Sequence, residues 1–307
     1  MKKFFFFLTV IATVIGMHSC SSADEPMKEV ASQEADYEVV VIDMSNHTTR
    51  ATIGTSPVVD TILKFKDREA YERTLDSVKQ LDEASKKRFF KKLGFNGAYS
   101  LLSKANDDFD EAFDLAETLD SISGVKVIMD CVAKYDGVLV FNDSDSVYTD
   151  VTPSLPFTDE NAKLLGNKDG YVMIGNELVA PQAGPTPVYN GQLIKYAEVK
   201  VKNGKYTSYF RLGRIGTNLG FQLETYRRAF LFKISDKNCR YNGAFRVWRN
   251  NKSYGITLNK DEKCGEWRID ALAKDYSPRM NLTVTNFSSS RDPKNKVSKT
   301  IKEILVK

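Results

Sequence analysis

The sequence predicts an α+β protein, with a small N-terminal helical bundle and mixed strands followed by a C-terminal antiparallel β-sandwich or barrel. Between residues 63 and 122, apolar residues recur at three- and four-residue steps, the period of an amphipathic helix. From residue 191 onwards, short β-prone runs alternate with turn residues, as in antiparallel sheets. Three prolines and a glycine lie between these parts, in residues 181–187.

The N-terminus reads as a secretory signal. Lys2 and Lys3 precede an apolar run over residues 4–15, and small residues then lead to Cys20. A run of about a dozen apolar residues is too short to cross about 30 Å of hydrocarbon. The pattern resembles a bacterial lipoprotein signal, which implies that residues 1–19 are removed and Cys20 is acylated, for example with palmitate. Residues 20–56 contain few apolar side chains and are expected to form a flexible tether, with one β-prone run at residues 39–42.

Residues 57–180 are expected to form a helical and mixed α/β region. Asp67 and Asp82 can cap two helices, the second of which stops at Gly94. A third helix is expected from Gly97 until residues 121–124. Three helices with short connections predict a small bundle.

The character of the chain changes after residue 124. Residues 125–132 and 138–141 are β-prone, and residues 171–174 and 177–179 predict a hairpin around Gly175 and Asn176. The proline-rich stretch predicts a linker over residues 181–190 and a domain boundary there.

Residues 191–307 are expected to form a basic β-rich domain. Asn203-Gly204 indicates a hairpin turn. The tail over residues 297–305 fits either a short helix or a last strand. The predicted strands cover residues 193–201, 206–212, 221–226, 229–234, 244–248, 254–258, 267–272 and 280–287.

The net charge of +4 hides an asymmetry along the chain. Residues 191–307 hold 25 Lys and Arg against 10 Asp and Glu, which leaves 19 against 30 of the totals of 44 and 40 for residues 1–190. The first part is therefore acidic and the second basic, which favours contact between the two or an anionic ligand for the second.

Cysteine usage fits an oxidising compartment. A Cys239–Cys264 disulfide would close a loop of about 26 residues and contribute about 3–4 kcal/mol in the chain-entropy model. The alternative is two separately buried thiols. Cys131 lies in an apolar run and is expected to be a buried free thiol.

The sequence gives no sign of a catalytic residue, a cofactor or a metal site. His18 belongs to the signal, so His47 is the one histidine left for a nucleophilic mechanism, and it lies in a polar stretch. The acidic residues between 107 and 114 could hold calcium, but a solvated helix face is the simpler interpretation. The turn at residues 142–145 lacks the glycine and the glutamate of a calcium loop.

Four residues of the basic half are candidate ligand-binding residues. Strand alternation places Tyr209 and Arg211 on the face of one strand that points away from the core, and Arg246 and Trp248 on the corresponding face of another. Aromatic faces stack on sugars, and arginine binds sulfate, carboxylate or phosphate. The alternative is that these side chains pack against the acidic helical half.

Three segments resemble uncharacterised Bacteroidetes cell-surface lipoproteins. They are Ser19-Cys20-Ser21-Ser22 with the acidic residues behind it, residues 65–75 followed by Leu93-Gly94-Phe95, and residues 167–175. The resemblance implies an outer membrane lipoprotein anchored through Cys20 and exposed at the cell surface, with the periplasmic face as the alternative. It implies no activity, because such proteins have no assigned function.

These observations favour a non-catalytic binding module for anionic or glycan ligands, such as a polysaccharide or glycolipid. The alternative is a structural or protein-interaction lipoprotein without a small ligand. A glycoside hydrolase with two carboxylates comes third, and no nucleic-acid partner is expected.

Overall fold

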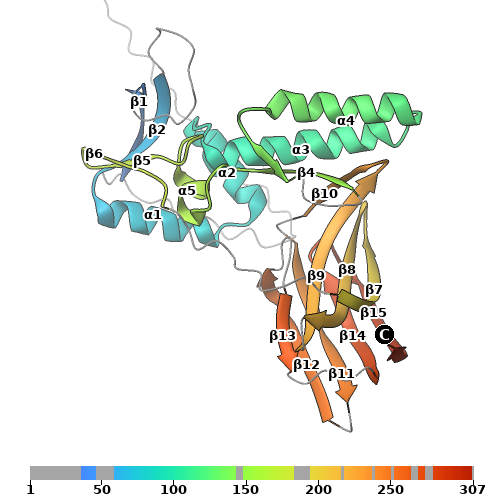
Figure 1. Cartoon of the computed structure of the whole chain (residues 1–307). Coiled ribbons are helices and arrows are strands. Elements are labelled where there is room, and N and C mark those ends of the chain that lie inside the picture. The colour runs from blue at the N-terminus through green and yellow to red at the C-terminus, as the bar shows by residue number, and fades with distance from the viewer. Residues whose placement is uncertain are drawn as a thin grey trace, which may run out of the picture. The chain divides into compact units, whose positions relative to one another are not determined.

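The computed structural model describes residues 36–45, 59–142, 148–182, 194–215, 218–236, 239–249, 252–263, 269–273 and 279–305. The predicted signal peptide, Cys20 and most of the linker lie outside these residues. The described part contains five helices and three sheets, which confirms a mixed class of helices and strands (Figure 1). Each of these three sheets is open in the part that is described, so no barrel forms there. No helix of the described segments is long and apolar enough to cross a membrane.

The first sheet has the strand order β1-β2-β5-β6. β2 pairs with β5 in parallel, and the other pairs are antiparallel. The predicted hairpin is confirmed, because Gly175 takes the left-handed conformation (φ 60°) that its tight turn requires. β1 shows that part of the predicted tether is a strand, and β2 shows that residues 63–65 do not begin a helix. The bounds are β1 Tyr37–Asp43, β2 Val59–Phe65, β5 Val172–Ile174 and β6 Glu177–Val179.

The three predicted helices are confirmed as α1 (Arg68–Gln80), α2 (Glu83–Leu93) and α3 (Ala98–Ala116). The Asp67 carboxylate accepts a hydrogen bond from the backbone N–H of Ala70, and the Asp82 carboxylate accepts one from Ser85, so both capping predictions hold. α1 and α2 bury one face against the first sheet in a cluster that contains Leu63, Phe65, Leu75, Val78, Phe90, Phe95, Leu165 and Val172.

The strand predicted for residues 125–132 is wrong, because these residues belong to helix α4 (Ser121–Tyr135). The Asp120 carboxylate accepts hydrogen bonds from the backbone N–H groups of Ile122 and Ser123, at 3.0 and 3.1 Å, so residues 121–124 begin a helix instead of ending one. Ile128, Cys131 and Tyr135 recur at helical steps and are buried. A further short helix, α5 (Glu160–Leu165), was not predicted.

The second sheet has the order β3-β4-β10-β9-β8-β7, with β13 pairing with β9. β4 and β10 pair in parallel, so segments from both sides of residues 181–190 share this sheet. Residues 36–307 form one compact unit. The bounds are β3 Val140–Asn142, β4 Thr149–Ser154, β7 Ile194–Asn203, β8 Tyr206–Ile215, β9 Asn218–Ala229, β10 Phe232–Ser235 and β13 Ile269–Ala273.

The third sheet is antiparallel, with the order β12-β11-β14-β15. The tail that fitted two structures is a strand, β15. Each strand predicted after residue 191 has its counterpart, although a turn at Phe230 and Leu231 divides residues 229–234 between β9 and β10. The bounds are β11 Arg240–Arg249, β12 Lys252–Lys263, β14 Arg279–Ser289 and β15 Asp292–Leu305.

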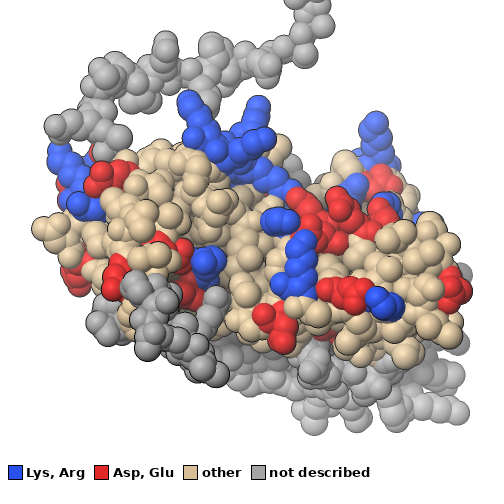
Figure 2. All heavy atoms as spheres, turned by 90° about the horizontal axis from the view of Figure 1, so that it is seen from above, with Lys and Arg blue, Asp and Glu red and all other residues tan. Residues whose placement is uncertain are grey.

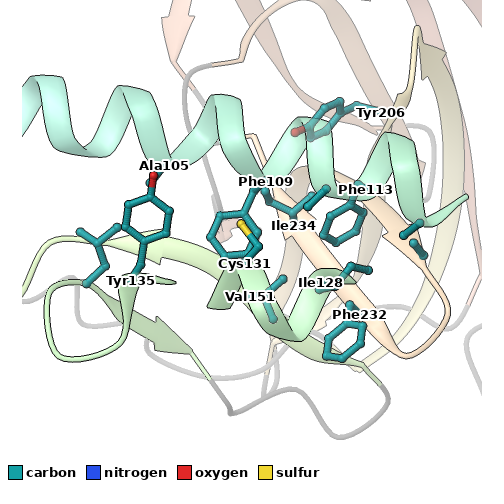
Figure 3. Packing of buried hydrophobic residues seen from close by; sticks show 14 of the residues in the cluster. Ala105, Phe109, Phe113, Ile128, Cys131, Tyr135, Val151, Tyr206, Phe232 and Ile234 are labelled. Atoms are coloured by element: carbon teal, nitrogen blue, oxygen red, sulfur yellow. The ribbon is translucent and has the colours of Figure 1, made fainter. Parts of the chain in front are cut away.

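Two hydrophobic clusters cover one face of the second sheet. One joins β7, β8 and β9 to the third sheet, through side chains that include Phe210, Leu212, Phe245 and Val247. The other joins β4 and β10 to α3 and α4, where Phe109 and Phe113 meet Ile128, Phe232 and Ile234 (Figure 3). The opposite face of the second sheet carries polar side chains.

Candidate functional site

The four candidate residues lie on two different sheets. Phe210 and Leu212 on β8, and Phe245 and Val247 on β11, point into the core that the second and third sheets share. Because side chains alternate along a strand, the residues between them point outward from their own sheet. Tyr209 and Arg211 are therefore on the outer face of the second sheet, and Arg246 and Trp248 are on the outer face of the third. The structure does not bring the two pairs into one site.

Arg211 is a buried structural residue, with 8% of its surface exposed. Its guanidinium donates to a Glu198 carboxylate oxygen at 2.6 Å, to Glu224 at 2.8 Å and to the Tyr226 hydroxyl at 3.1 Å. Burial by itself would lower the pKa of Arg211, but the hydrogen bonds that its guanidinium donates to Glu198 and Glu224 outweigh burial and raise this pKa. The positive charge of Arg211 is thus already balanced by the carboxylates of Glu198 and Glu224.

The polar network around Arg211 extends across the sheet. Glu224 also accepts a hydrogen bond from Lys233 Nζ on β10 at 3.3 Å, and Lys233 lies 3.7 Å from an Asp150 carboxylate oxygen on β4. Tyr209 is buried and stacks on Tyr226, with ring centroids 4.2 Å apart and planes 7° from parallel. Neither Tyr209 nor Arg211 presents a free surface to a ligand.

The outer face of the third sheet is open. Arg246 is exposed and Trp248 is half-buried. In the register of the sheet Arg246 lies between Gly255 and Thr283, so no side chain of β12 stands beside it. We call this surface the Arg246 face; its members are Ala244, Arg246, Trp248, Ser253, Gly255, Thr257, Thr283 and Thr285.

The Arg246 face exposes a charge and hydroxyl groups to solvent, although the Thr285 hydroxyl also donates to the Ala244 carbonyl oxygen at 3.4 Å. Among the described residues, no carboxylate pairs with Arg246. Ser253, Thr257 and Thr285 are exposed and supply hydroxyl groups along the same face. A positive charge, an indole ring and several hydroxyls thus share one surface.

The acidic residues of α3, predicted to be a solvated face, are largely paired. Asp110 accepts a hydrogen bond from the Tyr206 hydroxyl at 2.5 Å. Asp114 pairs with Lys205 and with Arg227, the latter at 2.7 Å, and Glu117 accepts from Arg227 at 2.8 Å. Consistent with such pairing, acidic and basic side chains are interspersed on much of the surface seen in Figure 2. No group of His, Cys, Asp or Glu suited to a metal ion exists among the residues that the structure describes.

These ion pairs lower the pKa of the Asp114 carboxyl. The hydrogen bond from Lys205 is the largest influence and lowers the pKa of this carboxyl, and Arg227 lowers it further. Desolvation acts in the opposite direction but is weaker than the combined effect of the two cations. Arg227 itself is almost completely buried, with 2% of its side chain exposed.

The cysteines of the described segments carry free thiols. Cys131 is buried between α3 and α4, as predicted, and burial together with the charge of Asp108 raises its pKa to about 11 (Figure 3). Cys239 is buried in the core shared by the second and third sheets and is also free. The predicted Cys239–Cys264 disulfide is therefore absent from this structure, and Cys264 itself lies outside the described residues. His47 and residues 143–147 lie outside them too.

The fold and its surfaces define a mixed α/β protein with a β-rich second half, and part of the chain is similar to a known family. Residues 57–201 match the model of a domain of unknown function, DUF4848. The crystal structure of a DUF4848 family protein from Bacteroides thetaiotaomicron is similar to 78% of this chain and 97% of its own, at 14% identity and a TM-score of 0.36. No curated protein matches the chain. The family match supports the expected resemblance to proteins without an assigned function, and it gives no information on the expected lipid anchor.

Proposed function

We propose that the protein is a lipid-anchored envelope protein whose C-terminal half is an antiparallel β-sandwich that binds anionic or glycan ligands without catalysis. In this proposal the N-terminal helices form a bundle that supports it. One observation carries the proposal: Arg246, which is exposed and has no carboxylate partner among the described residues, lies beside the half-buried Trp248 on the Arg246 face.

The Arg246 face has the chemistry that an acidic sugar requires. An indole ring offers an apolar surface on which the C–H face of a sugar ring stacks. A guanidinium donates two parallel hydrogen bonds to a carboxylate or sulfate group. The hydroxyls of Ser253, Thr257 and Thr285 donate and accept hydrogen bonds with sugar hydroxyls.

The test uses residues 20–307 with Cys20→Ser, which prevents acylation, and a panel of anionic and neutral glycans at low and high salt. Arg246→Ala and Trp248→Ala should each weaken binding at least about tenfold, since a charged hydrogen bond or a stacked ring contributes about 1.5 kcal/mol or more. Lys296→Ala, an exposed charge on β15, is the matched control and should change binding less than about twofold. Binding that ignores both Arg246 and Trp248, or no binding on the panel, would refute the proposal.

The placement in the outer membrane, exposed at the cell surface, is part of the same proposal. Support comes from the signal and Cys20 in the sequence. Cys20→Ala should move the protein from the membrane fraction to the soluble fraction. Protease added to intact cells should digest the wild-type protein if it is surface-exposed and leave it intact if it faces the periplasm.

A structural or protein-interaction role is the second candidate, because the basic half uses part of its charge inside the chain. Arg227 and Lys205 bind Asp114 of α3, and Arg227 also binds Glu117. If the basic residues of this half serve only to form such ion pairs, Arg227→Met should lower stability and cellular abundance. Arg246→Ala should then change neither stability, abundance nor ligand binding. A loss of ligand binding in Arg246→Ala would contradict it.

A further inference from the structure

We infer that helix α2 docks on the anionic headgroups of the membrane that carries the protein. The inference rests on the lipid anchor proposed above, and it concerns a surface separate from the Arg246 face. The sequence of α2, EASKKRFFKKL, contains five basic residues and one acidic residue. This is a strongly charged helix in the acidic half of the chain.

Three of the five cations of α2 have no carboxylate partner among the described residues, although Arg88 also donates a hydrogen bond to the Ser85 hydroxyl at 3.1 Å. Lys86 pairs with Glu83 at 3.1 Å, and Lys87 pairs with Asp107 at 2.8 Å. Arg88, Lys91 and Lys92 are exposed, and no carboxylate of the described residues binds any of them.

The apolar side of the same helix is occupied, so the basic side must face outward. Phe90 is buried, and its ring lies 5.0 Å from that of Phe89 and 4.9 Å from that of Tyr99. These contacts belong to the cluster beneath α1 and α2. The packing therefore fixes the direction in which Arg88, Lys91 and Lys92 point.

The position of α2 near the start of the described chain favours a membrane as its partner. The described chain begins at Asp36, which binds Arg73 at 3.1 Å, and the next residue, Tyr37, has its ring 6.1 Å from that of Phe89 on α2. Cys20 lies 16 residues before Asp36. The chain that leads back to Cys20 therefore leaves the described part next to α2. If Cys20 is acylated, tethering raises the effective concentration of headgroups at this helix.

The chemistry of the surface also fits a bilayer. The ammonium groups of Lys91 and Lys92 are point charges on flexible stems, and the guanidinium of Arg88 binds phosphate groups, so all three suit a layer of anionic headgroups. The aromatic residues of α2 are turned inward, so the helix offers no ring on which a sugar or a base could stack.

The test measures partition of residues 20–307 with Cys20→Ser into vesicles of 70% phosphatidylethanolamine and 30% phosphatidylglycerol, with phosphatidylcholine vesicles as the neutral reference. Each basic residue near an anionic surface raises the partition coefficient about fivefold. Joint substitution Arg88→Gln, Lys91→Gln and Lys92→Gln should therefore lower it about 100-fold, and high salt should weaken the wild-type binding.

The matched control removes three exposed charges elsewhere, by Lys294→Gln, Lys296→Gln and Lys299→Gln on β15, and should lower partition less than about threefold. Equal losses in both triple variants would show a non-specific effect of net charge and overturn the inference. Unchanged partition in the α2 variant would overturn it too, as would an α2-dependent binding of heparin without any binding of vesicles. The unacylated chain separates these outcomes from failure of the anchor, which Cys20→Ala tests in cells.

Discussion

Arg211→Ala should destabilise the protein far more than Arg246→Ala, although both remove an arginine from the outer face of a sheet. The substitution leaves Glu224, with 2% of its surface exposed, without the guanidinium 2.8 Å away. Breaking a buried ion pair by removing one partner costs about 3–5 kcal/mol. Lys233 Nζ still reaches Glu224 at 3.3 Å, so the lower end, about 3 kcal/mol, is expected.

Urea unfolding followed by circular dichroism measures this difference. In thermal unfolding of a chain of this size, about 3 kcal/mol corresponds to a loss of about 5 °C in Tm. Arg246→Ala should stay within about 0.5 kcal/mol of wild type, because it removes an exposed side chain that pairs with no carboxylate in the described part of the chain. A double-mutant cycle with Glu224→Ala should give a coupling of more than about 1 kcal/mol. A stability loss below about 1 kcal/mol for Arg211→Ala, or no coupling to Glu224, would refute the structural role of Arg211.

Three other predictions follow from single residues. Gly124→Ala should destabilise the protein by about 1–2 kcal/mol, although alanine has the better helix propensity. The new Cβ would overlap with the Phe230 ring and lie 2.9 Å from the Ala116 carbonyl oxygen. Thermal unfolding measures the change, and a gain in stability would contradict this packing. The pKa of the Asp114 carboxyl is lower in the folded protein than its ordinary value of 3.8, so its contribution to stability is present above about pH 4 and is lost as the pH falls through the folded pKa. The stability difference between wild type and Asp114→Asn should therefore narrow between about pH 4 and pH 2 in acid titrations, and a widening gap would show the opposite shift. Cys131, with a pKa raised to about 11, should react with iodoacetamide at pH 8 about 100-fold more slowly in the native than in the unfolded chain, and equal rates by peptide mass spectrometry would disprove its burial.

Local signals in the sequence are sufficient to predict the first three helices and the hairpin. Asp67, Asp82 and Gly94 mark helix ends through side-chain or backbone chemistry that acts within a few residues. Residues 125–132 were misread because valine and isoleucine favour strands, whereas the spacing of Ile128 and Cys131 fits a helix. The cap at Asp120 was the signal that decides between the two.

Long-range pairing was beyond the sequence. The parallel pairing of β4 with β10 joins residues about 80 positions apart in the sequence, and the residue pattern of neither strand predicts which strand it pairs with. Alternation correctly placed Arg211 on the outer face of β8, but its burial depends on the neighbouring strands. Glu198 and Glu224 are each the single acidic residue of an otherwise basic strand. This pattern is the sequence signal that Arg211 forms ion pairs within the chain.

Segments from both sides of residues 181–190 share the second sheet. The two parts of the chain are therefore held together by the sheet, and not by the peptide bonds of residues 181–190 alone. A protease that cuts between residues 182 and 194 would produce two polypeptides, one with β4 and α3 and the other with β9 and β10. The β4–β10 pairing and the ion pairs of Arg227 with Asp114 and Glu117 would still join them. The nicked protein should migrate as one species on a native gel and as two on a denaturing gel, so limited proteolysis alone would suggest a more divided molecule than the chain actually forms.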